Sequence, residues 1–171
     1  GGSAATTLSV AGAGSTFVQG GTATLNLGAA SGAAATVSLT GGGVLTSGTG
    51  LLTVHPTGTL NINGGTLNAN GNIVIDGGTL SRSTTGVFNL AASKNLTAQN
   101  GGQVSFTGNY SIGGGRTFTI QSGADLTTTT YLDIGSGSAG TLVVDGAGST
   151  LTTATSPFWG ANAGGNASVT I

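Results

Sequence analysis

Short apolar dyads recur along the whole sequence and constrain its fold more than any other feature. In each dyad, two apolar residues flank one residue that is mostly Ser, Thr or Asn. Successive side chains of a β-strand point to opposite sides, so a dyad directs two apolar groups to one side and its middle residue to the other. The sequence therefore predicts many very short, half-buried strands, and no segment has the apolar spacing of a helix. The dyads begin at Leu8, Leu25, Val37, Leu52, Leu60, Ile73, Phe88, Val104, Tyr110, Phe118, Leu132, Leu142 and Val169.

The dyads are separated by clusters of glycine, and the pattern repeats. Glycine reaches positive φ without a steric penalty, so clusters such as 64–65 and 101–102 predict tight turns. Residues 63–78 and 100–115 share one pattern of Asn, Gly and apolar residues, 37 positions apart. We interpret the module as strand, turn, strand, short loop and strand, with 22 to 37 residues between copies and two turns of coil in the longest interval.

Two further features accompany this repeat. Apolar pairs eight residues apart recur in the same modules and start at Leu67, Val104, Leu126 and Leu151. Asparagines at matched positions, Asn63 with Asn100 and Asn72 with Asn109, are expected to stack their amides.

A repeat of short strands and glycine corners is typical of a β-solenoid, in which each unit buries its apolar side only against a neighbour. A sandwich or barrel would favour strands of about five or six residues. We therefore predict an all-β fold, a right-handed parallel β-solenoid (β-helix) of about seven to nine short-stranded coils, about 35–45 Å tall. Residues 1–171 are expected to form one domain, with less regular coils in 1–57 and clear repeats in 58–171.

The composition excludes several classes of function. Only 4% of the 171 residues are charged, against about a quarter in an ordinary domain. Three Lys and Arg residues cannot supply the basic surface that nucleic acids or anionic membrane surfaces require. No apolar run approaches the roughly 20 residues of a membrane span. We expect no nucleic-acid partner and no membrane insertion, and the absence of Cys excludes disulfides and thiolate sites.

The titratable residues do not form a recognisable catalytic or metal-binding pattern. The carboxylates are dispersed and read as turn caps, His55 precedes Pro56 without a partner, and no calcium-binding repeat is present. We therefore expect no catalytic residue, no metal, no cofactor and no enzyme activity. The carboxylates are Asp76, Asp125, Asp133 and Asp145.

The segments GTLNINGGTLNANGNIVIDGGTL, GTLVVDGAGSTLTT and FWGANAGGNASVTI resemble the passenger repeats of bacterial autotransporter adhesins and related surface proteins with β-solenoid stalks. The resemblance covers residues 58–171 and, weakly, 1–57. It implies an exported bacterial β-solenoid with a structural or adhesive role. The expected location is extracellular or at the bacterial cell surface.

The end segments GGSAATTLSV and ASVTI lack the charged or helical cap that blunts a solenoid end, and the net charge is only −1. We therefore predict a structural protein whose subunits stack end to end into a fibre by β-augmentation. A segment of a longer adhesin stalk is the alternative. Ice binding through Thr-x-Thr pairs is a third hypothesis, although the pairs lie at different offsets from their dyads. A surface glycan or host receptor as partner stays open. The predicted subunit interface consists of Leu8, Val10, Phe158, Trp159, Val169 and Ile171.

Overall fold

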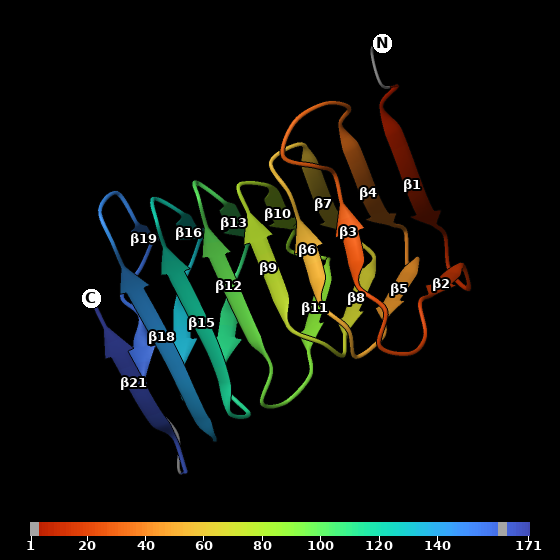
Figure 1. Cartoon of the computed structure of the whole chain (residues 1–171). Helices are drawn as coiled ribbons and strands as arrows, with labels where there is room; N and C mark the ends of the chain where they lie inside the picture. The colour runs from red at the N-terminus through yellow and green to blue at the C-terminus, as the bar shows by residue number, and fades with distance from the viewer. Residues whose placement is uncertain (1–3, 161–163) are drawn as a thin grey trace.

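The strands stack in parallel, coil upon coil. The computed structural model describes residues 4–160 and 164–171, and this part of the chain contains strands but no helix. Each strand pairs in parallel with the equivalent strand of a neighbouring coil. Figure 1 shows the coils following one another from β1 to β21. The fold is therefore an all-β parallel β-solenoid, which confirms the fold class predicted from the dyads.

Each coil contributes strands to three faces, which we number in chain order. The first face is a seven-stranded sheet of β1 (Thr6–Ala11), β4 (Ala35–Thr40), β7 (Gly58–Asn63), β10 (Thr79–Arg82), β13 (Gln103–Phe106), β16 (Asp125–Thr128) and β19 (Thr150–Thr153). The third face is a seven-stranded sheet of β3 (Leu25–Leu27), β6 (Leu52–Val54), β9 (Ile73–Asp76), β12 (Asn95–Gln99), β15 (Arg116–Gln121), β18 (Ala139–Asp145) and β21 (Asn166–Thr170).

The second face lies between them in the chain and is divided into two sheets. One sheet holds β2 (Thr16–Val18), β5 (Val44–Ser47), β8 (Thr66–Ala69) and β11 (Val87–Leu90). The other holds β14 (Tyr110–Ile112), β17 (Leu132–Ile134) and β20 (Phe158–Trp159). The second face is therefore interrupted between β11 and β14, whereas the first and third faces are continuous.

The described residues make about six turns between β1 and β19, slightly fewer than the predicted seven to nine coils but compatible with them, since seven strands are stacked on the first face. The number of residues per turn of the coil varies along the chain. Thr6 pairs with Ala35, 29 residues further on, whereas Thr59 pairs with Thr79, 20 residues further on. The extra residues lie in the corners, so the same length of chain makes fewer coils.

The interpretation of the 37-residue repeat as two turns was wrong. Asn63 ends β7 on the first face, whereas Asn100 follows β12 on the third face. The repeat thus superimposes strands of different faces, because many strands carry similar dyads and many corners carry similar glycines. The predicted Asn63–Asn100 amide stack cannot form for this reason. An amide pair forms instead between Asn89 Nδ2 and Asn68 Oδ1, 2.9 Å apart on the second face.

The core consists of the inward residues of the dyads, stacked from coil to coil. Burial of each large aliphatic side chain contributes about 1.5–3 kcal/mol. The outward residues form polar ladders, such as the 2.7 Å bond that Ser81 Oγ donates to Asn61 Oδ1. The central column of the first face, in which each side chain is at most 3% exposed, contains Val37, Leu60, Leu80, Val104 and Leu126.

An arginine occupies an inward position beside the break in the second face. Arg82 ends β10 in register with Ile62 and Phe106, whose side chains are at most 1% exposed. Its Nη2 donates to the Thr107 and Asn109 carbonyls, at 3.1 and 2.8 Å, and its guanidinium lies 5.4 Å from the Phe106 ring centre. These bonds hold the loop that leads into β14, so Arg82 helps to set the path of the chain where β14 does not pair with β11.

Candidate functional site

The N-terminal end of the solenoid presents three strand edges that pair with no described strand. β1, β2 and β3 are the first strands of their sheets, and their inward side chains continue the core columns. Leu8 and Leu25 are partly buried, and Phe17 is 37% exposed, whereas Val10 is buried. Of the predicted interface residues at this end, Leu8 is therefore partly exposed, whereas Val10 in the same strand is buried.

The C-terminal end has the same arrangement of edges. β19, β20 and β21 end their sheets, and Leu151, Trp159 and Val169 lie in register with the buried Leu126, Ile134 and Leu142. The partner positions show that these three side chains face inward, and Trp159 is nevertheless 57% exposed. Among the described residues, the last layer of the core at this end is therefore partly exposed.

Two other predicted interface residues lie at the C-terminal end in different positions. Phe158 pairs with Asp133, a middle residue of its dyad, and so lies on the outer side, where its ring packs edge-on against Tyr131 at 5.0 Å. Ile171 is 91% exposed directly after β21. Phe158 therefore belongs to the side of the rod, next to the end face.

Sequence reasoning missed three apolar residues of the end faces. Leu25 begins a dyad and Leu151 begins an eight-residue pair, so both carried a usable signal. Phe17 is not part of a dyad, and its inward orientation is evident only from its register with the buried Leu45. Together the two end faces contain Leu8, Phe17 and Leu25 at one end and Leu151, Trp159 and Val169 at the other.

A row of polar side chains follows the corner after the third face. His55 Nδ1 lies 3.8 Å from Asp76 Oδ2, so the expectation that His55 has no partner was wrong. Gln99 Nε2 donates to Asp76 Oδ1 at 3.2 Å, and Gln121 Nε2 donates to Gln99 Oε1 at 3.1 Å. The amides thus connect successive coils and satisfy the carboxylate. Within residues 4–160 and 164–171, no three His, Cys, Asp or Glu side chains gather into a group that could hold a metal ion.

Asp125 connects the last three coils of the first face. Its Oδ1 accepts a hydrogen bond from the Thr150 hydroxyl, and its Oδ2 accepts one from Gln103 Nε2 at 2.7 Å. These bonds, that of Thr150 first, hold the pKa of Asp125 below its ordinary value. The row therefore attaches the C-terminal coil to the rest of the solenoid through a charge.

This lowered pKa predicts a small dependence of stability on pH. Asp125 stabilises the fold above its unfolded pKa of about 3.9, and this contribution is lost as pH falls through the folded value. We expect the urea midpoint of the wild type to exceed that of Asp125→Asn at pH 6, and the gap to shrink by pH 3. Thr150→Val removes the main hydrogen-bond donor to Asp125. In that background, the difference in urea midpoint between Asp and Asn at position 125 should therefore also be smaller. A gap that is constant with pH would contradict this role.

The outer side of the first face carries hydroxyl groups in register. Thr7, Thr36, Thr59 and Thr79 form one row across four coils. The Thr-x-Thr pairs that suggested ice binding are 22/24, 57/59, 117/119, 127/129 and 153/155, and of these residues only Thr59 belongs to the row. Gln103 continues the row on the next strand and Asp125 follows it, so the hydroxyl array is interrupted by an amide and a carboxylate.

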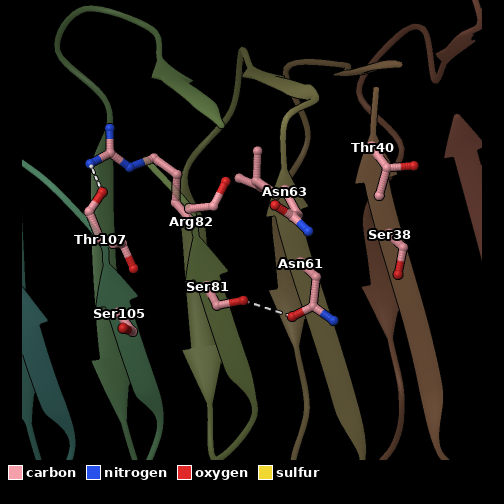
Figure 2. Close-up of a pocket in the computed structure, with 10 residues that line it drawn as sticks. Ser38, Thr40, Asn61, Asn63, Ser81, Arg82, Ser105 and Thr107 are labelled. Carbon is pink, nitrogen blue, oxygen red and sulfur yellow. Dashed lines mark hydrogen bonds between the residues drawn. The ribbon is translucent and has the colours of Figure 1, made fainter. Parts of the chain in front are cut away.

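An open groove of about 430 Å³ runs across the strand ends of this face. It spans strands β4, β7, β10 and β13, and Figure 2 shows its polar side chains arranged strand by strand. Ile62 is its one apolar lining residue, and Arg82 its one charged residue. The remaining lining residues are Ser38, Thr40, Asn61, Asn63, Ser81, Ser83, Ser105 and Thr107.

The part of the chain that the structure describes has no helix long and apolar enough to cross a membrane. The fold is that of a structural repeat protein in general. No protein-family model, curated protein or solved structure matches the chain.

Proposed function

We propose that this chain is a structural protein of the bacterial cell surface or extracellular matrix, and that its solenoids stack end to end into a fibre. The observation that carries the proposal is the correspondence between the two end faces. Each presents one open inward apolar position on each of the three faces of the solenoid. The proposal assigns the chain a mechanical role and no catalytic one.

The register of the sheets supports a joint without rearrangement. An unbroken series of paired residues connects Leu8 at one end with Leu151 at the other, and a second series connects Leu25 with Val169. A second copy translated along the solenoid axis would therefore place Leu8 over Leu151 and Leu25 over Val169. β19 and β21 of one copy would then pair in parallel with β1 and β3 of the next, as in every other coil.

The aromatic residues fit the same joint on the second face. Phe17 and Trp159 both occupy inward positions, and stacking would cover these two half-exposed rings. Covering aromatic surface is a large source of binding energy at protein interfaces.

Electrostatics offers no obstacle to this contact. The six strands at the two ends contain no Lys, Arg, Asp or Glu. Edge strands that avoid association commonly carry charges, bulges or Pro, and none of the six contains Pro. With a net charge of −1, whole copies also repel each other very little.

The inward apolar residues that are in register from coil to coil could equally continue into further coils of one longer polypeptide. A segment of an adhesin stalk is therefore the second candidate function. Low charge suits either setting outside a cell, because three Lys and Arg residues offer few sites for trypsin-like proteases. The two candidates differ in one measurable property, since only the first requires separate copies to associate.

Assembly is tested by blocking each end separately with a charge. We expect the wild type to form filaments in negative-stain microscopy and large species in sedimentation velocity, with the fraction rising with concentration. Phe17→Lys and Leu151→Lys should each reduce assembly to monomers, because every head-to-tail joint in either variant would bury a lysine without a partner. Thr152→Lys adds the same charge at an outward position of β19 and should leave the filaments intact.

Mixing the two blocked variants tests the direction of the contact. Each variant keeps one free end, so an equimolar mixture should give discrete heterodimers and no filaments, as a head-to-tail interface requires. Wild-type solenoids that stay monodisperse at high concentration would overturn end-to-end assembly and favour the stalk. Circular dichroism of each variant checks that its remaining coils are folded.

A further inference from the structure

The groove on the first face combines a repeated polar lining with a single positive charge. Ser38, Asn61, Ser81 and Ser105 are paired residues on successive strands, so their polar groups form one row along the solenoid axis. Figure 2 shows this row crossing the strands, with Thr40, Asn63 and Thr107 along the strand ends beside it. Adjacent strands lie about 4.8 Å apart, so the row offers hydrogen-bonding groups at a regular spacing.

The lining favours a hydroxyl-rich polymer over a protein. Protein interfaces are anchored by buried aromatic and large apolar side chains. Here eight lining residues are Ser, Thr or Asn and only Ile62 is apolar. Hydroxyls and amides can both donate and accept hydrogen bonds, as sugar hydroxyls also do. A saccharide chain lying along the axis could therefore contact the same row of groups on several strands.

Arg82 gives the groove its one positive charge. Its Nη2 donates to two backbone carbonyls, and no carboxylate among the described residues forms an ion pair with it. Phe106 and Tyr110 line its guanidinium at 5.4 and 5.6 Å and limit its hydration. Burial lowers the pKa of Arg82, in keeping with a cation that lacks a compensating anion.

None of the lining residues is acidic. An anion placed beside the guanidinium would therefore meet no opposing carboxylate within the groove. Charge-assisted bonds from Arg to a carboxylate are stronger than neutral hydrogen bonds and add geometric specificity. The groove thus combines a neutral, hydroxyl-binding row with one site for a negative charge.

We propose that this groove binds an acidic polysaccharide along the solenoid axis, with sugar hydroxyls on the Ser and Asn row and a sugar carboxylate at Arg82. The site lies on the side of a single solenoid and involves no end-face residue. Its existence is therefore independent of end-to-end assembly, and each hypothesis can fail without the other. In a fibre the groove would recur in every copy.

The proposal is tested by calorimetric titration with oligogalacturonates, using the same oligomers fully methyl-esterified as neutral probes. We expect the wild type to bind the acidic oligomers and to bind the esters at least about tenfold more weakly, since the charge-assisted bond is lost. Raising the salt concentration should weaken only the acidic binding, because exposed charges are screened. Phe17→Lys, which blocks one end, should bind like the wild type.

Variants locate the binding to the groove. Ser81→Asp places a carboxylate in the polar row and should lower the affinity for acidic oligomers at least about tenfold. Thr119→Asp makes the same charge change on the outer side of the third face, between the buried Phe118 and Ile120, and should have no effect. Arg82→Gln should abolish the preference for acidic over esterified oligomers, with thermal melts to check folding.

Each outcome decides the question. Absence of binding to the acidic oligomers, or equal affinity for the esterified ones, would overturn the proposal. Equal losses in Ser81→Asp and Thr119→Asp would do so as well, because binding would then reflect only net charge. Should Arg82→Gln fail to fold, the pair of Asp variants still gives a decisive comparison, since both positions are outward.

Discussion

Phe106→Ala is expected to lower the free energy of unfolding by about 3–5 kcal/mol, the usual range for truncating a fully buried aromatic ring. Phe106 is 0% exposed, its ring stacks on Tyr110 at 4.3 Å, and it lies 5.4 Å from Phe88. These rings belong to β11, β13 and β14, on either side of the break in the second face. Because β11 and β14 do not pair with each other, side-chain packing joins the two coils on the second face, so a cavity at this point should be costly.

Loss of Phe106 would also leave Arg82 poorly supported. The guanidinium would lose one of its two flanking rings and face a cavity in the core. A repeat protein is stabilised by contacts between neighbouring coils. Weakening the contact at the break should therefore make the coils before it and the coils after it unfold less cooperatively. We expect a broader thermal transition in addition to the lower stability.

Urea denaturation followed by circular dichroism measures the effect, at protein concentrations low enough to avoid assembly. Phe158→Ala is the matched control, because it removes the same ring from a position that is 48% exposed. We expect this control to cost about 1 kcal/mol or less. Equal losses in the two variants would show that the cluster at the break has no special importance.

Gly102→Ala is expected to destabilise the solenoid by at least about 2 kcal/mol, since extra atoms in a closely packed region force backbone shifts. A Cβ at this position would overlap the Ile75 carbonyl oxygen, far inside the van der Waals distance, and would lie 3.0 Å from the Gln99 carbonyl oxygen. Both are backbone atoms of a sheet and cannot move aside as the end of a flexible side chain can. The clash would therefore push neighbouring coils apart at this corner.

The next coil supplies a close control for this prediction. Ala124 occupies the same corner position one turn later and is 0% exposed, so a Cβ is accommodated there. Ala124→Gly should cost only about 1–2 kcal/mol, from the lost methyl group and the freer unfolded chain. Thermal and urea midpoints of both variants test the comparison. If Gly102→Ala is no more harmful than Ala124→Gly, close approach of the coils is not what requires glycine.

The two glycines of this corner serve different purposes, and the sequence could predict only one of them. Gly101 has φ of +77°, which is the turn geometry expected from paired glycines. Gly102 lacks a positive φ and is required by the neighbouring backbone instead. Contact between coils depends on the register between them, and this register is not visible in a local sequence pattern.

The polar contacts between coils show the same limit. The dyads correctly placed Leu60 and Ile62 inside with Asn61 outside, because strand geometry alone decides this alternation. The contact of His55 with Asp76 was missed, because it depends on the 21 residues that separate these positions matching one turn of the coil. The inward position of Arg82 was not predicted, for a related reason. A charged side chain argues against burial, and the backbone carbonyls that accept its hydrogen bonds are known only from the structure.

The sequence by itself determined the class of fold. Alternating dyads and glycine corners specify short half-buried strands that need neighbours on both sides, and a chain with 4% charged residues can stack Thr, Ser and Asn without repulsion between coils. Only the tertiary structure decided which strands are neighbours, that Phe17, Leu25 and Leu151 complete the two end faces, and where Arg82 meets the polar row. The physical reason is that alternation is a local property of each strand, whereas register depends on how the lengths of all corners add up around the coil.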